Sequence, residues 1–214
     1  MIKAVIFDMD GVLVDNSKIH FEAFVVFCKR HGVDISADAL KPFFGMGNDE
    51  IIPAVLSREI EPSELKALAD EKEIIYRDIF ASTIKPLDGL VDMLRGLKDM
   101  GVKIAVGSSG NTDNVNFVLE KCGIASYFDA IANGDMITRA KPDPEVFLLA
   151  AKLLGIEPES CLVFEDSFAG IKAARSAGMA AIAVATTYTR DEHKDYDAII
   201  DDFTQINSEQ VISI

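Results

Sequence analysis

The sequence predicts an α/β fold in which a Rossmann-like core of parallel strands carries an inserted all-helical cap. Two observations predict it. From residue 85 onward, short apolar runs alternate with segments of helical periodicity, which is typical of a parallel sheet covered by helices. Between the first apolar run and residue 85, the pattern is helical throughout. We therefore expect residues 1–15 and 85–214 to form the core domain and residues 16–84 to form the cap domain.

The first strand is predicted over residues 3–7, a short apolar run that leads directly into the acidic segment Asp8 to Gly11. From residue 17, apolar side chains recur at the three- and four-residue spacing of a helix, and Gly32 ends that pattern. Residues that commonly stand at helix starts precede the remaining helical patterns of the cap. These patterns cover residues 36–44, 48–58 and 62–82.

Helices and strands alternate after residue 85. The predicted helices cover residues 90–97, 112–122, 144–154 and 168–177. The predicted strands cover residues 102–106, 130–132, 161–164, 180–185 and 197–200. Because a helix connects most of these strands to the next, we expect them to form one parallel sheet.

The chain is strongly acidic, with 21 basic against 35 acidic residues and a formal net charge of −14. A field of this sign repels phosphate backbones and anionic lipids, so we expect no nucleic acid and no membrane partner. The first apolar run is too short for a signal peptide, and no window reaches the ~18 apolar residues of a spanning helix. No obligate protein partner is indicated. A bound divalent cation would still admit a small anionic substrate.

The three cysteines, Cys28, Cys122 and Cys161, are far apart in the sequence and have no CxxC spacing. This pattern indicates neither a disulfide framework nor a zinc site. We therefore expect a reducing environment and a cytoplasmic protein.

Four polar clusters follow four of the predicted strands. In a parallel sheet the carboxyl ends of the strands meet at one edge, so the clusters should converge there. The third cluster is the least firmly placed, because eight residues separate it from the apolar run before it. The clusters are Asp8-Met9-Asp10, Ser108-Ser109, Lys141-Pro142 and Glu165-Asp166.

Asp8 and Asp10 stand two residues apart, and in an extended backbone such residues point to one side while Met9 turns into the core. Two carboxylates this close repel each other unless one is protonated or both share a cation. With Glu165 and Asp166 at the same edge, the cluster favours a hard divalent ion, Mg²⁺.

Lys141 would offset part of the remaining negative charge, and the Ser108 hydroxyl with nearby backbone N–H groups would bind an anion. This set fits phosphoryl transfer, in which one aspartate attacks phosphorus while the other moves the protons. Each cluster alone has a plainer interpretation as a turn, a loop or a helix cap. Their occurrence in this order after strands favours a site.

The segment from Asp8 to Asp15 (DMDGVLVD), taken together with the other three clusters, resembles the motifs of the haloacid dehalogenase superfamily of phosphatases and phosphomutases. The resemblance covers essentially the whole chain and is nearest to the β-phosphoglucomutase-like subgroup. It implies that Asp8 is the nucleophile and Asp10 the general acid and base. It also implies that Ser108 and Lys141 hold the transferring phosphoryl group.

The same resemblance implies a Mg²⁺ cofactor. The ion would be held by Asp8, the Asp10 carbonyl and Asp166, and Glu165 would assist it directly or through water.

In this family the cap decides the substrate. His20 corresponds to a hinge-region histidine and Lys72 to a cap lysine that reaches the substrate. From the residues alone, His20 could also be an imidazole packed at a helix face, and the first interpretation of Lys72 is a solvated helix charge. His31 and His193 are predicted to be structural or surface residues. The substrate-binding residues implied by the resemblance are His20, Gly45, Asn48, Lys72, Ser109 and Asn111.

The expected activity is Mg²⁺-dependent hydrolysis of a small phosphate monoester, a sugar or polyol phosphate, through an aspartyl-phosphate. Asn48 stands where related mutases typically carry an arginine, and Asn111 replaces a lysine. Both changes remove positive charge that would hold a second phosphate, which favours a hydrolase. A β-phosphoglucomutase-type hexose-phosphate mutase is the alternative. A catalytically idle binding protein is disfavoured, because Asp8, Asp10 and Lys141 are all present.

Overall fold

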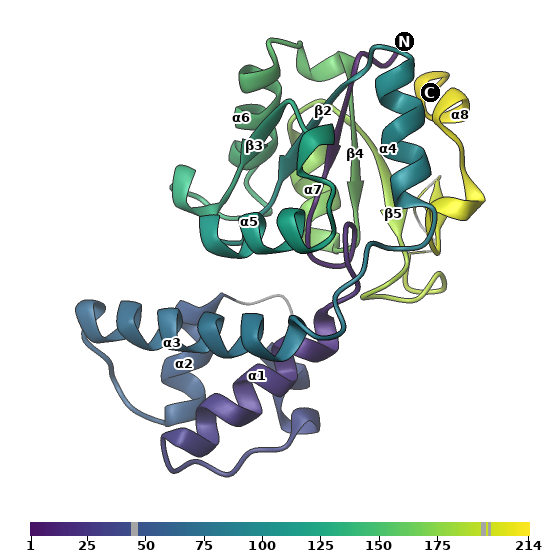
Figure 1. The fold of residues 1–214 in the computed structure, drawn as a ribbon. Coiled ribbons are helices and arrows are strands. Elements are labelled where there is room, and N and C mark those ends of the chain that lie inside the picture. Colours follow the sequence, from purple (N-terminus) through teal and green to yellow (C-terminus); the bar gives the residue numbers. More distant parts are fainter. Residues whose placement is uncertain (44–46, 194–195, 197) are drawn as a thin grey trace. The chain divides into compact units, whose positions relative to one another are not determined.

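The computed structural model describes residues 1–43, 47–193, 196 and 198–214 (Figure 1). The described chain separates into two compact units. The core unit comprises Met1–Asp15 and Ile84–Ile214, and the cap unit comprises Asn16–Thr83. No helix within the described ranges is long and apolar enough to cross a membrane.

The core unit is built on a six-stranded sheet in which neighbouring strands are parallel. The strand order is β3-β2-β1-β4-β5-β6, so β1 and β4 lie at the centre. Both are buried along their whole length, which explains why their sequences are continuous apolar runs up to Glu165. The predicted α/β fold is confirmed. The strands are β1 (Ala4–Phe7), β2 (Lys103–Gly107), β3 (Ala130–Ala132), β4 (Cys161–Glu165), β5 (Ala180–Val184) and β6 (Ile199–Ile200).

Both faces of this sheet are covered. On one face, Ile6 packs in a buried cluster with Phe147 of α6 and small residues of α7. Phe7 points to the opposite face, where its ring stacks on Phe164 with centroids 5.2 Å apart and packs against Phe203 at 5.8 Å. This alternation follows from the two-residue period of a strand. The helices are α4 (Leu90–Asp99), α5 (Thr112–Lys121), α6 (Glu145–Leu154), α7 (Phe168–Ser176) and α8 (Ser208–Ile212).

The described part of the cap unit contains helices only. Its α1 packs against α3, and Phe27 and Tyr76 are fully buried. Pro62 occupies the first turn of α3, where its missing N–H breaks no hydrogen bond. Within the helix predicted over 36–44, the structure describes residues 37–43 as a 3₁₀ helix. The elements are α1 (Ser17–Arg30), η1 (Ala37–Phe43), α2 (Asn48–Leu56) and α3 (Pro62–Phe80).

Candidate active site

Polar residues follow the central strands of the core unit at one edge of the sheet. Asp8 comes directly after β1, Ser108 directly after β2, and Asp166 directly after β4, whose last residue is Glu165. Because β1 pairs with both β2 and β4, the three strand ends are neighbours. The parallel topology therefore places these side chains together.

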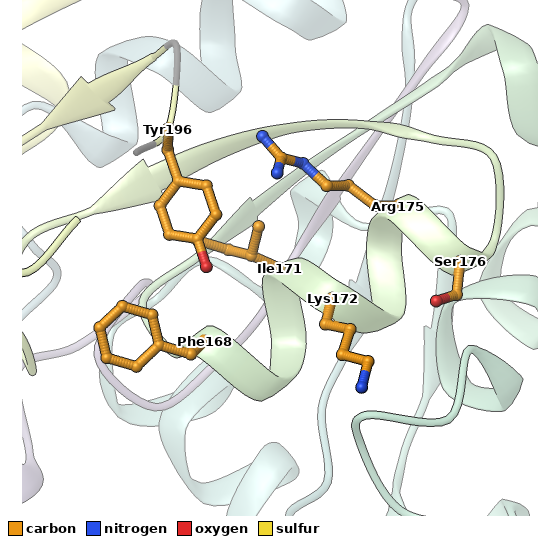
Figure 2. A pocket seen from close by; sticks show the side chains of 6 residues that line it. All are labelled: Phe168, Ile171, Lys172, Arg175, Ser176 and Tyr196. Carbon is orange, nitrogen blue, oxygen red and sulfur yellow. The ribbon is translucent and has the colours of Figure 1, made fainter. Parts of the chain in front are cut away.

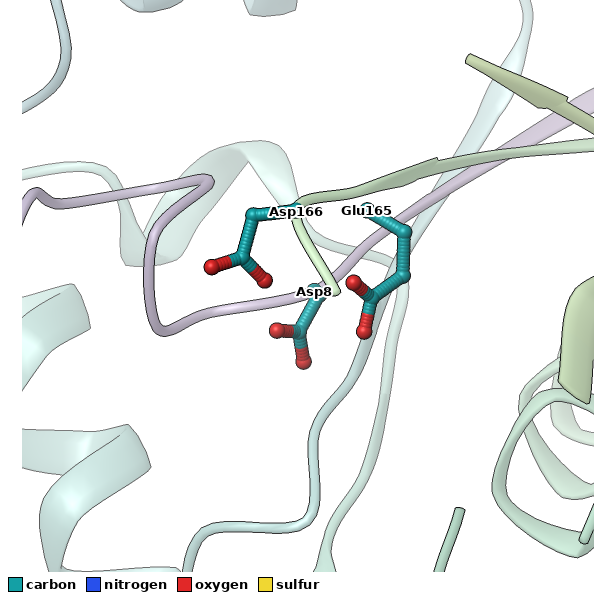
Figure 3. A group of neighbouring side chains, drawn as sticks. All are labelled: Asp8, Glu165 and Asp166. Atoms are coloured by element: carbon teal, nitrogen blue, oxygen red, sulfur yellow. The ribbon is translucent and has the colours of Figure 1, made fainter. Parts of the chain in front are cut away.

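Three carboxylates form the centre of this site. Asp8, Glu165 and Asp166 are all buried, and each offers an oxygen within 4.8 Å of the others. Figure 3 shows the three carboxylates gathered together, with that of Asp8 between those of Asp166 and Glu165. Burial raises the pKa of Asp8 to about 7; Lys141 opposes this shift, and the charges of Glu165 and Asp10 reinforce it. Burial also raises the pKa of Asp166 well above its usual range.

These raised pKa values mean that the three carboxylates are not all ionised at neutral pH without a counterion. Oxygen donors in a small buried cluster are the ligand set that Mg²⁺ prefers. The residues present therefore fit the ion that the sequence predicts. Its ligands within this cluster would be Asp8 and Asp166.

Lys141 is the cation of the site. Its Nζ lies 2.7 Å from Asp8 Oδ1 and 2.9 Å from Glu165 Oε1, and it stands 4.7 Å from the centre of the Phe147 ring. Burial disfavours the charge of Lys141, but the two carboxylates outweigh that effect and raise its pKa. Lys141 therefore stays protonated. The Lys141 cluster, which the sequence places least firmly, therefore lies beside the acidic residues of the other clusters.

Glu165 is held by its neighbours as well as by Lys141. Its Oε2 accepts from the Ser167 N–H at 2.7 Å, and its Oε1 accepts from the Ser167 hydroxyl at 3.2 Å. The same hydroxyl accepts from the Gly170 N–H at 3.0 Å and caps α7. A Cβ on Gly170 would overlap the Glu165 carboxylate. Glu165 is therefore fixed in a position from which it orients Lys141.

The loop after β1 depends on a glycine. Gly11 has a φ of +77°, and a Cβ added to it would overlap the Asp166 carboxylate. Its carbonyl accepts from the Thr186 hydroxyl at 2.5 Å. Met9 is fully buried, as the alternation of Asp8 and Asp10 predicts.

We expect Gly11→Ala to weaken Mg²⁺ binding at least tenfold, because the new methyl group must displace the Asp166 carboxylate. The left-handed backbone alone would cost a non-glycine residue about 1–2 kcal/mol. Gly101→Ala separates the two effects: its φ is +73°, and its Cβ would meet nothing within 4 Å. Titration calorimetry with Mg²⁺ on both variants makes the comparison. Equal losses of affinity would show that the overlap with Asp166 is unimportant.

The raised pKa of Asp8 also predicts a pH dependence. Between pH 3.8, the ordinary pKa of an aspartate, and about pH 7, Asp8 keeps its proton in the folded, metal-free chain but has released it in the unfolded chain. The contribution of this proton to stability is therefore full below pH 3.8 and is lost as the pH rises through 7. Mg²⁺ must compete with the proton, so the rise in Tm that Mg²⁺ causes should be larger at pH 8 than at pH 5.5. An equal rise at both values would contradict this.

Asp10 and Ser108 complete the polar edge. Ser108 is buried, and its Oγ accepts from the Gly110 N–H at 3.0 Å. A Cβ on Gly110 would lie 3.2 Å from Ser108 Oγ and 3.9 Å from Asp10 Oδ2, so both side chains border the same glycine. The charge of Asp10 also contributes, after burial, to the raised pKa of Asp8. The four residues predicted to be catalytic thus lie at one edge of the sheet.

Other predicted binding residues lie in the loop after β2 and in the cap unit. Ser109 is exposed, and the Asn111 side chain accepts from the Asn114 N–H at 2.8 Å to cap α5. Gly45 lies outside the described residues. A role of these residues in binding substrate stays a prediction.

In the cap unit, Lys72 is 2% exposed and is not a solvated charge. Its Nζ lies 2.9 Å from His20 Nδ1 and 2.8 Å from Glu73 Oε1. Asn48 Nδ2 donates to the same Glu73 oxygen at 2.7 Å, and the His20 ring stacks on Tyr76. Glu73 thus accepts hydrogen bonds from two of the predicted binding residues. No signal in the sequence distinguishes it from an ordinary acidic residue on the surface of a helix. The three predicted binding residues His20, Asn48 and Lys72 thus form one partly buried polar group with Glu73.

Comparisons with known proteins identify the family of this chain. The model of the haloacid dehalogenase-like hydrolase family matches residues 2–178. The phosphorylated carbohydrates phosphatase of Thermotoga maritima is 33% identical over 181 residues, which are 83% of this chain and 82% of that protein. The chloroplastic Suppressor of Quenching 1 protein of Arabidopsis thaliana is 35% identical over 91% of this chain, but the chain spans only 19% of its length.

Among solved structures, the β-phosphoglucomutase of Clostridium difficile superimposes with a TM-score of 0.86 and 29% identity, over 100% of this chain and 96% of that one. The chain therefore belongs to the haloacid dehalogenase-like hydrolase family and, within it, to the β-phosphoglucomutase-like subgroup.

Proposed function

We propose that this protein is a Mg²⁺-dependent phosphatase that hydrolyses a small sugar or polyol phosphate through an aspartyl-phosphate on Asp8. The observation that carries the proposal is the placement of Asp8, which lies 2.7 Å from Lys141 and within a buried cluster of carboxylates. A carboxylate that attacks an anionic ester needs positive charge beside it, which Lys141 supplies and which a cation held by the carboxylates would add. The similarity to a phosphatase of phosphorylated carbohydrates supports the substrate class.

The proposed reaction has two steps. An Asp8 oxygen forms a bond to phosphorus while the bond to the leaving oxygen breaks, and Asp10 gives that oxygen its proton. A water then attacks phosphorus and gives its proton to Asp10, and the bond to Asp8 breaks to release inorganic phosphate. Lys141 and Ser108 bind the phosphoryl oxygens throughout. Mg²⁺, when bound, supplies further positive charge against these oxygens.

The charges of the cap unit and of the loop after β2 favour hydrolysis over return of the phosphoryl group to the sugar. A mutase must hold a bisphosphate by its distal phosphate, and hydrogen bonds from an ionised donor are about twice as strong as neutral ones. Asn48 and Asn111 are neutral. The charge of Lys72 is paired with Glu73 at 2.8 Å, and this pairing weakens it as a phosphate binder. A mutase is the second candidate because of the likeness to β-phosphoglucomutase.

One assay separates the two candidates. The protein is incubated with Mg²⁺, β-glucose 1-phosphate and a trace of the bisphosphate, and free phosphate and glucose 6-phosphate are both measured. A panel of sugar and polyol phosphates is scored for phosphate release in parallel, with Asp8→Asn as the inactive control. We expect phosphate release to dominate. Rapid formation of glucose 6-phosphate with little free phosphate would establish the mutase, and no turnover of any phosphate ester would indicate an idle binding protein.

We also propose that the protein works in the cytoplasm on a small phosphorylated metabolite. All three cysteines are free, and Cys28 and Cys161 are buried. Burial raises the pKa of the Cys161 thiol to about 11, which keeps it in its unreactive form. These thiols suit a reducing compartment.

A further inference from the structure

His193 is buried beside the loop between β4 and α7 that carries Asp166. Its side chain is 0% exposed, and its Nε2 lies 3.1 Å from the backbone oxygen of Asp166. Because a carbonyl oxygen only accepts, this contact requires the proton to be on Nε2. His193 is therefore not a surface residue, and its polar contact is with the backbone of the proposed metal ligand.

Aromatic side chains enclose the ring of His193. Its centroid lies 5.0 Å from that of Phe168, 5.5 Å from that of Tyr196 and 5.9 Å from that of Tyr188. Within the described residues, its Nδ1 has no hydrogen-bond partner. The surroundings hold the imidazole in place, while the Nε2–H is directed at Asp166.

Two of these aromatic rings also face a surface pocket. Figure 2 shows Phe168 and Tyr196 at one side of it, and the Arg175 guanidinium stands 4.9 Å from the centre of the Tyr196 ring. The pocket has a volume of about 560 Å³. Phe168, at the start of α7, and Tyr196 thus lie between the imidazole and this pocket.

The segment that carries His193 contacts both loops of the acidic site. After β5, Thr186 donates to the Gly11 carbonyl at 2.5 Å, and a side-chain hydrogen bond from Thr187 acts on Asp166. A turn closed by the His193 N–H and the Thr189 oxygen, 3.1 Å apart, then returns the chain to the Asp166 backbone. The post-β5 segment, residues 186–193, therefore supports the two loops from outside.

We propose that His193 is a positioning residue for Mg²⁺: its hydrogen bond fixes the Asp166 peptide group and thereby aims the Asp166 carboxylate into the acidic cluster. The inference rests on the proposed function, which assigns Mg²⁺ to this cluster. Asp166 lies between the end of β4 and the start of α7, where no strand or helix hydrogen bond holds its carbonyl in the described chain. Residues that orient metal ligands in this way typically contribute a factor of 10–100 in metal affinity.

The test measures Mg²⁺ binding by titration calorimetry on the full chain. His193→Phe keeps a ring in the aromatic enclosure and removes the donor, and His193→Gln restores an N–H near the position of Nε2. We expect the Mg²⁺ Kd to rise 10- to 100-fold in His193→Phe and to return to within about threefold of wild type in His193→Gln. Because only metal occupancy is affected, kcat at saturating Mg²⁺ should change far less than the Mg²⁺ concentration that gives half-maximal activity. His31→Phe, at an exposed histidine of the cap unit, is the control.

Two results would overturn the proposal: an unchanged Mg²⁺ Kd in folded His193→Phe, or an equally large loss in both His193 variants. If His193→Phe does not fold, nuclear magnetic resonance of the wild type decides instead. The His193 ring should be in the Nε2-protonated tautomer, and its signals should shift on adding Mg²⁺. Unmoved signals would contradict the proposal. A wild-type chain that binds no Mg²⁺ would instead refute the proposed function.

Discussion

Asp8→Asn should abolish turnover of every phosphate ester and all covalent labelling of the protein by phosphoryl donors. An amide oxygen is a poor nucleophile, and the aspartyl-phosphate has no alternative site at this edge of the sheet within the proposed mechanism. The substitution keeps the size of the side chain, so the fold should persist. Steady-state rates and mass spectrometry of the trapped phosphoenzyme measure the two effects.

Asp15→Asn is the matched control for this variant. Asp15 lies in the same acidic segment but is exposed, and it has no role in the proposed mechanism. Its rates should stay within about twofold of wild type, because surface substitutions away from a site are usually near neutral. Residual hydrolysis by Asp8→Asn at more than a trace level, with phosphate still attached to the chain, would assign the nucleophile elsewhere.

The centre of the sheet was predictable from the sequence because β1 and β4 are buried on both faces. Such strands are continuous apolar runs, and the run predicted over 161–164 is β4, Cys161–Glu165. The same topology made the acidic edge predictable, since residues that follow parallel strands meet there. Lys141 joins Asp8 across 133 residues of sequence. We expected the two residues to converge because each follows a strand of the parallel sheet.

Other features depend on contacts that no local pattern encodes. Glu73 is an acidic residue on a helix, and its burial follows from Lys72 beside it and from Asn48, which lies 25 residues away. His193 meets the Asp166 backbone across 27 residues, through a turn after β5. In both cases the sequence shows a single polar residue that no surrounding pattern marks as special. The three-dimensional packing alone reveals its partner.

Asp10→Asn should lower kcat by about 10²–10⁴ while leaving the nucleophile able to react. Removing the charge of Asp10 removes one cause, after burial, of the raised pKa of Asp8, so Asp8 should be more fully ionised in this variant. A slower rate therefore reports the missing proton transfer and not a protonated nucleophile.

The two proton transfers of Asp10 can be separated by the leaving group. An alkyl phosphate needs a proton on its leaving oxygen, whereas a nitrophenyl phosphate releases a stable phenolate without one. With the nitrophenyl ester, Asp10→Asn should show a burst of phenolate equal to the enzyme concentration, followed by slow release of phosphate, because only the attack of water still lacks its base. With an alkyl ester no burst should appear. Stopped-flow absorbance and phosphate release measure the two phases, and slow phenolate formation without a burst would show that Asp10 has a different role.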